Sequence, residues 1–151
     1  MEIHKLNHKP GVEENDKLKE AFRQLDKLLK QLRSKELPAE IVESLNQEIE
    51  ELNSNSSSGD EFRKTIKKKQ TKIIELLEKE AKLVPRNYYR NIWLAVGMAA
   101  FGLPIGVVFG MSLDNMAYLG IGLPIGMAIG IGVGTGMDKK AFEEGRQLDI
   151  D

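Results

Sequence analysis

The chain has no cysteine, and this absence removes disulfide bonds, thiol nucleophiles and cysteine metal ligands from what its 151 residues can do. An excess of charge of one sign is also missing, because 22 basic and 23 acidic residues leave a net charge of −1. No overall field directs the chain to nucleic acid, so nucleic acid is not an expected partner. The first fifteen residues lack the apolar core of a secretory signal peptide.

Charge is completely absent from two segments, residues 92–111 and 117–137. At 1.5 Å per helical residue, each approaches the roughly 30 Å of a bilayer's hydrocarbon core. The connection between them, residues 112–116, is short, and its Asp114 and Asn115 favour a turn. The sequence therefore predicts two antiparallel transmembrane helices that form a hairpin and act as their own insertion signal.

Basic and aromatic residues set the expected orientation. Lysine and arginine precede the first span and follow the second, whereas the connecting loop has neither. Basic loops stay in the cytoplasm, so both termini are predicted to be cytoplasmic and the protein to be integral to a membrane, the bacterial inner membrane by expectation. Aromatic rings mark membrane interfaces, and the candidate anchors are Tyr88, Tyr89, Trp93 and Tyr118.

Glycine is concentrated in the apolar part: eleven of the 14 glycines lie from Gly97 to Gly136. A glycine inside a helix costs about 1 kcal/mol relative to alanine, so a soluble fold gains little from them. Membrane helices instead associate by close backbone approach at small residues spaced four apart. The predicted helix-packing and oligomerisation residues are Gly102, Gly106, Gly110, Gly120, Gly122, Gly126, Gly130, Gly132, Gly134 and Gly136.

The small residues of the second span form two stripes, displaced by about 200° around the helix. One stripe runs through residues 122, 126, 130 and 134, and the other through 120, 128, 132 and 136. We expect one to pack on the first span and the other on a neighbouring subunit, which closes a ring if the rotation permits. A hairpin packed within a monomer or dimer is the alternative.

A repeated Gly-Leu-Pro-Ile-Gly motif occupies residues 102–106 and 122–126. If the hairpin pivots at Asp114, Pro104 faces Pro124 near the bilayer midplane. Each proline removes a helical hydrogen bond and frees the carbonyl of residue 100 or 120. Paired structural kinks are the simpler interpretation, and a hinge or carbonyl-lined constriction is the functional one.

The remaining sequence is charged and favours helices. We expect a flexible tail over residues 1–14, an amphipathic helical hairpin over 15–53, a linker over 54–59 and a juxtamembrane helix over 60–90, followed by the two-span region 91–137 and a cytoplasmic tail over 138–151. Ser58 and Glu61 have capping-box spacing, and Pro85 should end or kink the third helix. The apolar stripes repeat in steps of four and three, which favours burial between chains, with an intramolecular three-helix bundle as the alternative.

Chemical groups for catalysis or metal binding are sparse. His4 and His8 have metal-compatible spacing only in a helix, which Pro10 and Gly11 oppose. The lysines at 67, 68, 69 and 72 are interpreted first as a solvated helix face, and otherwise as a contact for anionic lipid or RNA. The spans offer no acid, base or nucleophile, so we expect no enzyme, no catalytic residues, no cofactor and no metal site.

Residues 130–136, Gly-Ile-Gly-Val-Gly-Thr-Gly, resemble the glycine-rich inner helix of the rotary ATP synthase ring subunit, which is also a two-helix hairpin. That family carries a carboxylate at mid-membrane on its other helix, and residues 92–111 have none, so the resemblance does not imply an ion-driven rotor. More broadly, the chain is similar to glycine-zipper membrane proteins, many of which oligomerise and some of which form pores.

Two functions follow from these expectations. The first is a homo-oligomeric channel or pore, with the hinge or constriction at Pro104 and Pro124 and the loop mouth at Asp114 and Asn115. The second is a membrane-anchored scaffold or accessory subunit whose cytoplasmic helices recruit a protein partner. The expected partners are the lipid bilayer, further copies of the chain and, in the second case, a cytoplasmic protein. The overall fold class is all-α, a transmembrane hairpin with an N-terminal amphipathic helical or coiled-coil region.

Overall fold

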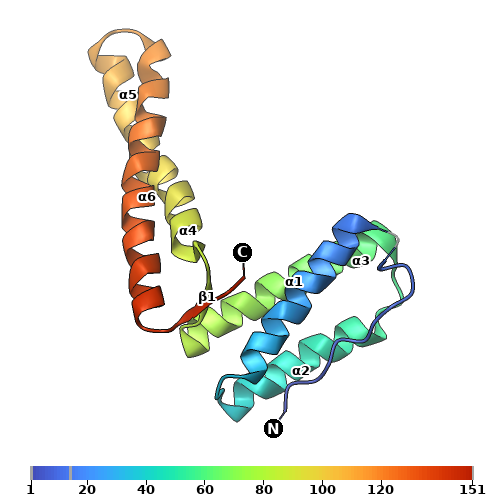
Figure 1. Ribbon diagram of the computed structural model, residues 1–151. Coiled ribbons are helices and arrows are strands. Elements are labelled where there is room, and N and C mark those ends of the chain that lie inside the picture. The colour runs from blue at the N-terminus through green and yellow to red at the C-terminus, as the bar shows by residue number, and fades with distance from the viewer. Residues whose placement is uncertain (1, 14, 151) are drawn as a thin grey trace. The chain divides into compact units, whose positions relative to one another are not determined.

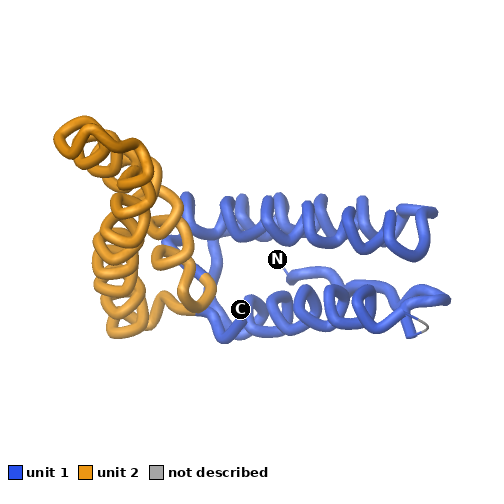
Figure 2. Tube along the Cα trace, turned by 90° about the horizontal axis from the view of Figure 1, so that it is seen from above, with its two compact units in different colours: residues 1–84, 148–150 blue, residues 85–147, 151 orange. Residues whose placement is uncertain are grey.

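The computed structural model describes residues 2–13 and 15–150, most of which lie in helices (Figure 1). The chain divides into two compact units (Figure 2). The first contains the chain up to residue 84 together with residues 148–150, and the second contains residues 85–147. The second unit is thus an insertion between two parts of the first.

Three helices build the first unit: α1 (Asp16–Arg33), α2 (Ala39–Ser54) and α3 (Gly59–Leu76). Asn15 begins α1, since its side chain accepts hydrogen bonds from the backbone N–H groups of Lys17 and Leu18. The capping box predicted at Ser58 is not formed, because the Ser58 side chain makes no cap bond. A capping box needs helical dihedrals directly after the cap, and Gly59 has a φ of +56°.

The core of the first unit lies within one chain. Helix α3 packs against both α1 and α2, and leucine, isoleucine and phenylalanine side chains from all three helices are fully buried. Burial between chains, which the sequence analysis favoured, is therefore not needed to cover these stripes. The largest buried side chains are Leu18, Leu25, Leu28, Leu29, Leu32, Leu45, Ile49, Leu52, Phe62, Ile66, Ile73 and Leu77.

Both chain ends add to this core, where the sequence predicts tails. Ile3 and Val12 from the N-terminal segment and Leu148 and Ile150 from the C-terminal segment are buried in the same cluster. Gln31 of α1 binds the backbone of the C-terminal segment twice, because its amide accepts from Asp149 N (2.8 Å) and donates to Asp149 O (3.0 Å). These apolar side chains thicken a core that three short helices alone would leave thin.

The expected helix over residues 60–90 is interrupted. After α3, a π-helical segment η1 (Leu77–Ala81) ends at Lys82, which has a left-handed φ of 56°. Strand β1 (Val84–Pro85) follows and pairs with β2 (Gln147–Leu148). Proline disfavours helical dihedrals in the preceding residue, which explains why the helix ends before Val84.

The second unit consists of two long helical segments. The first joins α4 (Tyr88–Gly97), a π-helical turn η2 (Met98–Gly102) and α5 (Leu103–Ser112). The second begins with a 3₁₀ turn, η3 (Met116–Tyr118), and continues as α6 (Leu119–Glu143). The two segments run antiparallel and pack along each other (Figure 1). Helix α6 therefore extends six residues into the region predicted as a C-terminal tail.

Candidate functional site

The contact between the two long segments is made by glycines. Gly122, Gly126, Gly130 and Gly134 of α6 are all buried against the first segment. A β-carbon placed on Gly126 would lie 2.5 Å from the carbonyl oxygen of Gly97 and 2.6 Å from the amide nitrogen of Gly102. Real β-carbons essentially never approach within 3.0 Å. The backbones are thus too close for any residue other than glycine at this position.

The inner face of the first segment has four buried glycines, Gly97, Gly102, Gly106 and Gly110, the last of which lies against Met116 at the turn. The step from Gly97 to Gly102 is five residues, which would rotate Gly97 away from the stripe in a regular α-helix. The π-helical turn η2 spans this step and uses about one more residue than an α-helical turn. The turn therefore keeps all four glycines on one face. Gly97 was missed as a packing residue, and its five-residue spacing was the reason.

An acidic side chain ends the glycine stripe. Asp138 follows Gly134 by four residues and is only 7% exposed. Its carboxylate accepts hydrogen bonds from the backbone N–H groups of Tyr89 (3.0 Å) and Arg90 (2.9 Å) in the first turn of α4. The local residue Asn87 makes no side-chain cap bond. Asp138 thus caps α4 from the neighbouring helix and places a negative charge at its positive end. The continued four-residue spacing was the signal that the sequence analysis missed.

Three further glycines of α6 face open space within the described chain. A β-carbon on Gly120, Gly132 or Gly136 would meet nothing within 4 Å. Pro124 and Ala128 share this stripe at four-residue spacing, and both are exposed. We call the stripe through residues 120, 124, 128, 132 and 136 the open face of α6.

Large apolar side chains cover the outside of the helix pair, whereas glycine fills the inside. Two segments, Tyr88–Ser112 and Met116–Glu143, are long and apolar enough to cross a membrane, and only 17% of the most apolar stretch of each is buried. A core helix of a soluble protein would be mostly buried. The exposed apolar residues include Ile92, Val96, Phe101, Leu103, Val108, Phe109, Ile121, Ile125, Ile129 and Val133.

The two prolines lie outside the glycine contact. Gly102 and Gly106 of the first segment lie against Gly126 and Gly122 of α6, which is the register that the predicted hairpin implies. Pro104 and Pro124 are both exposed, so the glycine stripes and not the prolines occupy the contact face. Pro104 lies in the first turn of α5, directly after the π-helical turn. Pro124 lies inside α6, on its open face.

The loop residues serve the turn. Asp114 has a left-handed φ of 51°. The Asn115 side chain accepts from the Ala117 N–H at 2.9 Å and begins the 3₁₀ turn. Tyr118 closes that turn and is 39% exposed.

At the other end of the pair, the rings of Tyr88 and Tyr89 are in an edge-to-face contact at 5.3 Å. Trp93 is half-buried, and its backbone carbonyl lies against Gly130. The candidate aromatic anchors thus lie at both ends of the helix pair.

In the first unit, a carboxylate joins α2 to α3. Glu48 forms ion pairs with Lys69, at 2.6 Å, and with Lys72, while Lys69 also pairs with Glu51. Burial by itself raises the pKa of Glu48, but the hydrogen bonds from the two lysines outweigh burial and leave that pKa below its ordinary value. Burial lowers the pKa of Lys69, and its bonds to the two glutamates outweigh this and raise it. Two of the four clustered lysines therefore serve packing.

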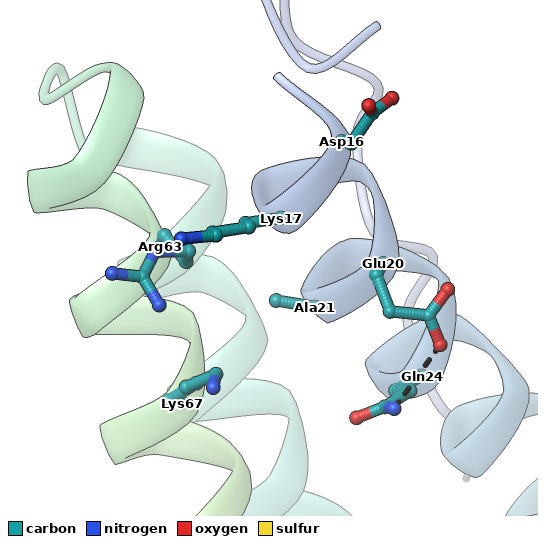
Figure 3. Close-up of a pocket in the computed structure, with 7 residues that line it drawn as sticks. All are labelled: Asp16, Lys17, Glu20, Ala21, Gln24, Arg63 and Lys67. Carbon is teal, nitrogen blue, oxygen red and sulfur yellow. Dashed lines mark hydrogen bonds between the residues drawn. The ribbon is translucent and has the colours of Figure 1, made fainter.

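A hollow of about 470 Å³ lies between α1 and α3 (Figure 3). Lys17 of α1 extends toward Arg63 of α3, and Lys67 lies one turn further along α3 (Figure 3). Glu20 turns away from these cations and accepts a hydrogen bond from Gln24 at 3.1 Å. The hollow thus presents three cationic groups on an otherwise mixed surface.

The two histidine side chains make separate contacts. His4 Nδ1 lies 3.2 Å from a carboxylate oxygen of Glu50, and the ring centres of His8 and Phe22 are 5.9 Å apart in an edge-to-face contact. Across residues 2–13 and 15–150, no group of three or more histidine, cysteine or acidic residues could hold a metal ion.

The chain matches no protein-family model, no curated protein and no solved structure. Its function is therefore argued from the glycine contact, the open face and the first unit alone.

Proposed function

We propose that the protein is an integral membrane protein that assembles with copies of itself through the open face of α6 and forms a pore. One observation carries the proposal: glycine fills the contact between the two long helical segments, and large apolar side chains point outward. This is the reverse of a soluble core. It suits lipid, where packing at small residues holds helices together and apolar side chains face the solvent.

The open face supports self-association. One small-residue stripe of α6 is used within the chain, and the second lies unoccupied at the same four-residue spacing. A surface of this kind permits another helix to approach as closely as the first segment approaches the buried stripe. If the open face meets a different face of the next copy, the contact is heterologous, and it closes as a ring where the rotation between copies permits.

The test is a count of subunits. Gly132→Leu blocks the open face, whereas Val133→Leu adds a methylene on the adjacent exposed stripe as a matched control. Gly132→Leu should lower the subunit number of the purified protein in nanodiscs, by native mass spectrometry or imaging, and Val133→Leu should leave it unchanged. A monomer in the wild type, or equal numbers in both variants, would reject self-association through this face.

Conduction needs its own measurement. Pro124 leaves the carbonyl of Gly120 without its helical partner, and both residues lie on the open face. In the proposed ring, this carbonyl and the bend at Pro104 shape the path. The double variant Pro104→Ala, Pro124→Ala should alter single-channel currents in planar bilayers at unchanged subunit number. Silent bilayers with an intact oligomer would reject the pore.

Orientation in the membrane follows from charge. With basic residues flanking both spans and none in residues 112–116, both termini are proposed to be cytoplasmic. A cysteine at Asn115 should react with an impermeant external thiol reagent in intact cells, and a cysteine at the exposed Lys68 should not. The native chain contributes no background because it has no cysteine.

A membrane-anchored scaffold is the second candidate, and the first unit favours it. A pore does not require a separately packed helical unit, whereas a scaffold does. The cations Lys17, Arg63 and Lys67 around the hollow would suit an acidic protein segment. Lys17→Glu with Lys67→Glu should then abolish co-purification of a partner while subunit number and current stay unchanged.

A further inference from the structure

The chain segment of residues 2–9, here called the N-terminal arm, is bound to α2 through its backbone. Asn46 accepts a hydrogen bond from His4 N (2.8 Å) and donates one to Glu2 O (3.0 Å). Asn53 repeats this pattern with Asn7 N (2.8 Å) and Lys5 O (3.0 Å). Each amide thus uses both its acceptor and its donor on one stretch of extended chain, in the way that a neighbouring strand would.

The repeat has a geometric basis. Asn46 and Asn53 are seven residues apart, which is about 10.5 Å along an α-helix. The bound positions on the arm are three residues apart, which is about 10 Å in extended chain. The two lengths agree. An asparagine two turns further along α2 therefore meets an equivalent pair of backbone groups three residues further along the arm. Such contacts recognise an extended backbone whatever its side chains.

Other contacts select the arm's own sequence. Arg33 at the end of α1 donates to the carbonyls of Ile3 (3.2 Å) and His4 (2.6 Å). The Ile3 side chain is 6% exposed, and Leu6 packs on the same core. The Lys9 ammonium lies 4.3 Å from the centre of the Phe62 ring and donates to the carbonyl of Asn55. The surface thus selects an apolar side chain at the positions of Ile3 and Leu6 and a cation at the position of Lys9.

We propose that this arm-binding surface, formed by Arg33, Asn46, Asn53 and Asn55 around the apolar core, is a site for an extended peptide, and that its ligand in the assembled protein is the arm of a neighbouring copy. A second copy supplies every group that the surface binds, so the arm makes the same contacts within a chain and between copies. This inference rests on the self-association proposed above.

The connection between arm and α1 permits the exchange. It begins with a turn in which Gly11 has a φ of +86°, a conformation that other residues rarely adopt. Opened out, the six steps of chain from Lys9 to Asn15 reach roughly 20 Å. An arm can therefore leave its own surface and reach that of an adjacent copy at such a distance. Exchange of identical elements through a short hinge is a recognised route to oligomers.

The test uses cysteines placed in a chain that has none. The side chains of His4 and Glu50 lie 3.2 Å apart across the arm contact, and neither side chain takes part in the asparagine hydrogen bonds, which use the backbone of His4. Differently tagged full-length chains carrying His4→Cys or Glu50→Cys are co-expressed, purified in nanodiscs and treated with a short bifunctional maleimide. A product that carries both tags is expected. The double variant in a single chain verifies that the two positions can be joined.

Two further variants identify the contact. Asn46→Ala with Asn53→Ala removes four hydrogen bonds and should lower the two-tag product roughly tenfold. Gln47→Ala, exposed on the same helix, should leave it unchanged. A Gly-Ser insertion of four residues after Gly11 lets the arm fold back more freely and should also lower the product.

A parallel experiment cross-links Gly132→Cys between copies. It separates the proposal of arm exchange from the proposal of self-association through the open face of α6. Gly132 cross-links without a two-tag arm product would overturn arm exchange and leave the oligomer standing. A two-tag arm product without Gly132 cross-links would support exchange and overturn the ring through α6. If Glu50→Cys chains form adducts with another protein and none between copies, the surface binds a different protein, and arm exchange is overturned. If neither cross-linked product forms, both proposals are rejected.

Discussion

The two units of this protein solve the packing problem in opposite ways. In the first, leucine, isoleucine and phenylalanine fill the inside, and charged residues cover the outside. In the second, glycine lies inside, and large apolar residues lie outside. One chain thus contains two rules for which side chain belongs in a core. This difference agrees with the proposed place of the second unit in lipid, because water drives large apolar groups together and lipid does not.

Charged residues show the same contrast. The first unit surrounds its core with ion pairs, and its most buried acid, Glu48, holds two lysines. Among the described residues of the second unit, the glycine contact buries one acid, Asp138, whose carboxylate accepts from backbone N–H groups. A carboxylate at a helix N-terminus is satisfied by the helix itself. The second unit therefore needs no buried basic residue opposite Asp138.

The largest effect should come from removing bulk in the first unit. Leu29 is fully buried, and Leu29→Ala should lower the free energy of unfolding of this unit by about 2–5 kcal/mol. Hydrogen exchange of the α1–α3 amides measures it, with the exposed Lys30→Ala as control. Protection that is equal in the two variants would contradict the assigned core.

Adding bulk should damage the second unit. A β-carbon on Gly122 would lie 2.7 Å from Gly106 Cα, so Gly122→Ala should destabilise the helix pair by roughly 1–3 kcal/mol. Within one chain, a β-carbon on Gly120 meets nothing within 4 Å, so Gly120→Ala should instead stabilise α6 of a separated copy by up to about 1 kcal/mol. Exchange rates of the α4 and α6 amides in nanodiscs report both. The same sign for both variants would break the comparison between the units.

Charge removal at Glu48 should come next. Glu48→Gln should cost the first unit about 1–2 kcal/mol, because Lys69 loses its more buried partner. Glu51→Gln is the matched control, since Glu51 is half-exposed and its pair with Lys69 should contribute at most about 1 kcal/mol. Denaturant midpoints of the first unit, followed by a probe in α3, compare the two. Equal costs would mean that burial of Glu48 adds nothing.

The same network predicts a pH dependence. The pKa of Glu48 lies below its ordinary 4.5 in the folded protein, so its contribution is complete above 4.5 and is lost as the pH falls through the folded value. The pKa of Lys69 is raised above 10.5, so its contribution is complete below 10.5 and is lost as the pH rises through the folded value. Stability of the wild type should fall at both extremes, and Glu48→Gln should flatten the acid side.

The smallest effect should come from the inter-helix cap. Asp138→Ala removes two acceptors from the first turn of α4 and should cost about 1 kcal/mol. Asp138→Asn keeps an acceptor and should lose roughly half of that. The effect should be local, with faster amide exchange at Tyr89 and Arg90. Unchanged exchange at these two amides would show that water replaces the carboxylate.

Local sequence patterns predict much of the helical structure. Helix α1 begins at Asp16, one residue after the start of the predicted amphipathic hairpin, and Ser58 precedes α3. The two apolar segments follow from the absence of charge. The packed chain ends were not predictable, because single residues such as Ile3 and Ile150 carry no periodicity. Their burial depends on amide groups of Asn46 and Gln31, which lie far away in the sequence.

The sequence by itself determined the helical content, the two segments suited to a membrane and the four-residue spacing of glycine, because each depends on residues close in the chain. The tertiary structure decided which stripe of α6 is used, since both stripes have the same spacing and only contact with the first segment distinguishes them. It also decided that a π-helical turn brings Gly97 into line and that Asp138 caps α4. These features arise where backbones from distant parts of the chain meet, and no local pattern contains that distance.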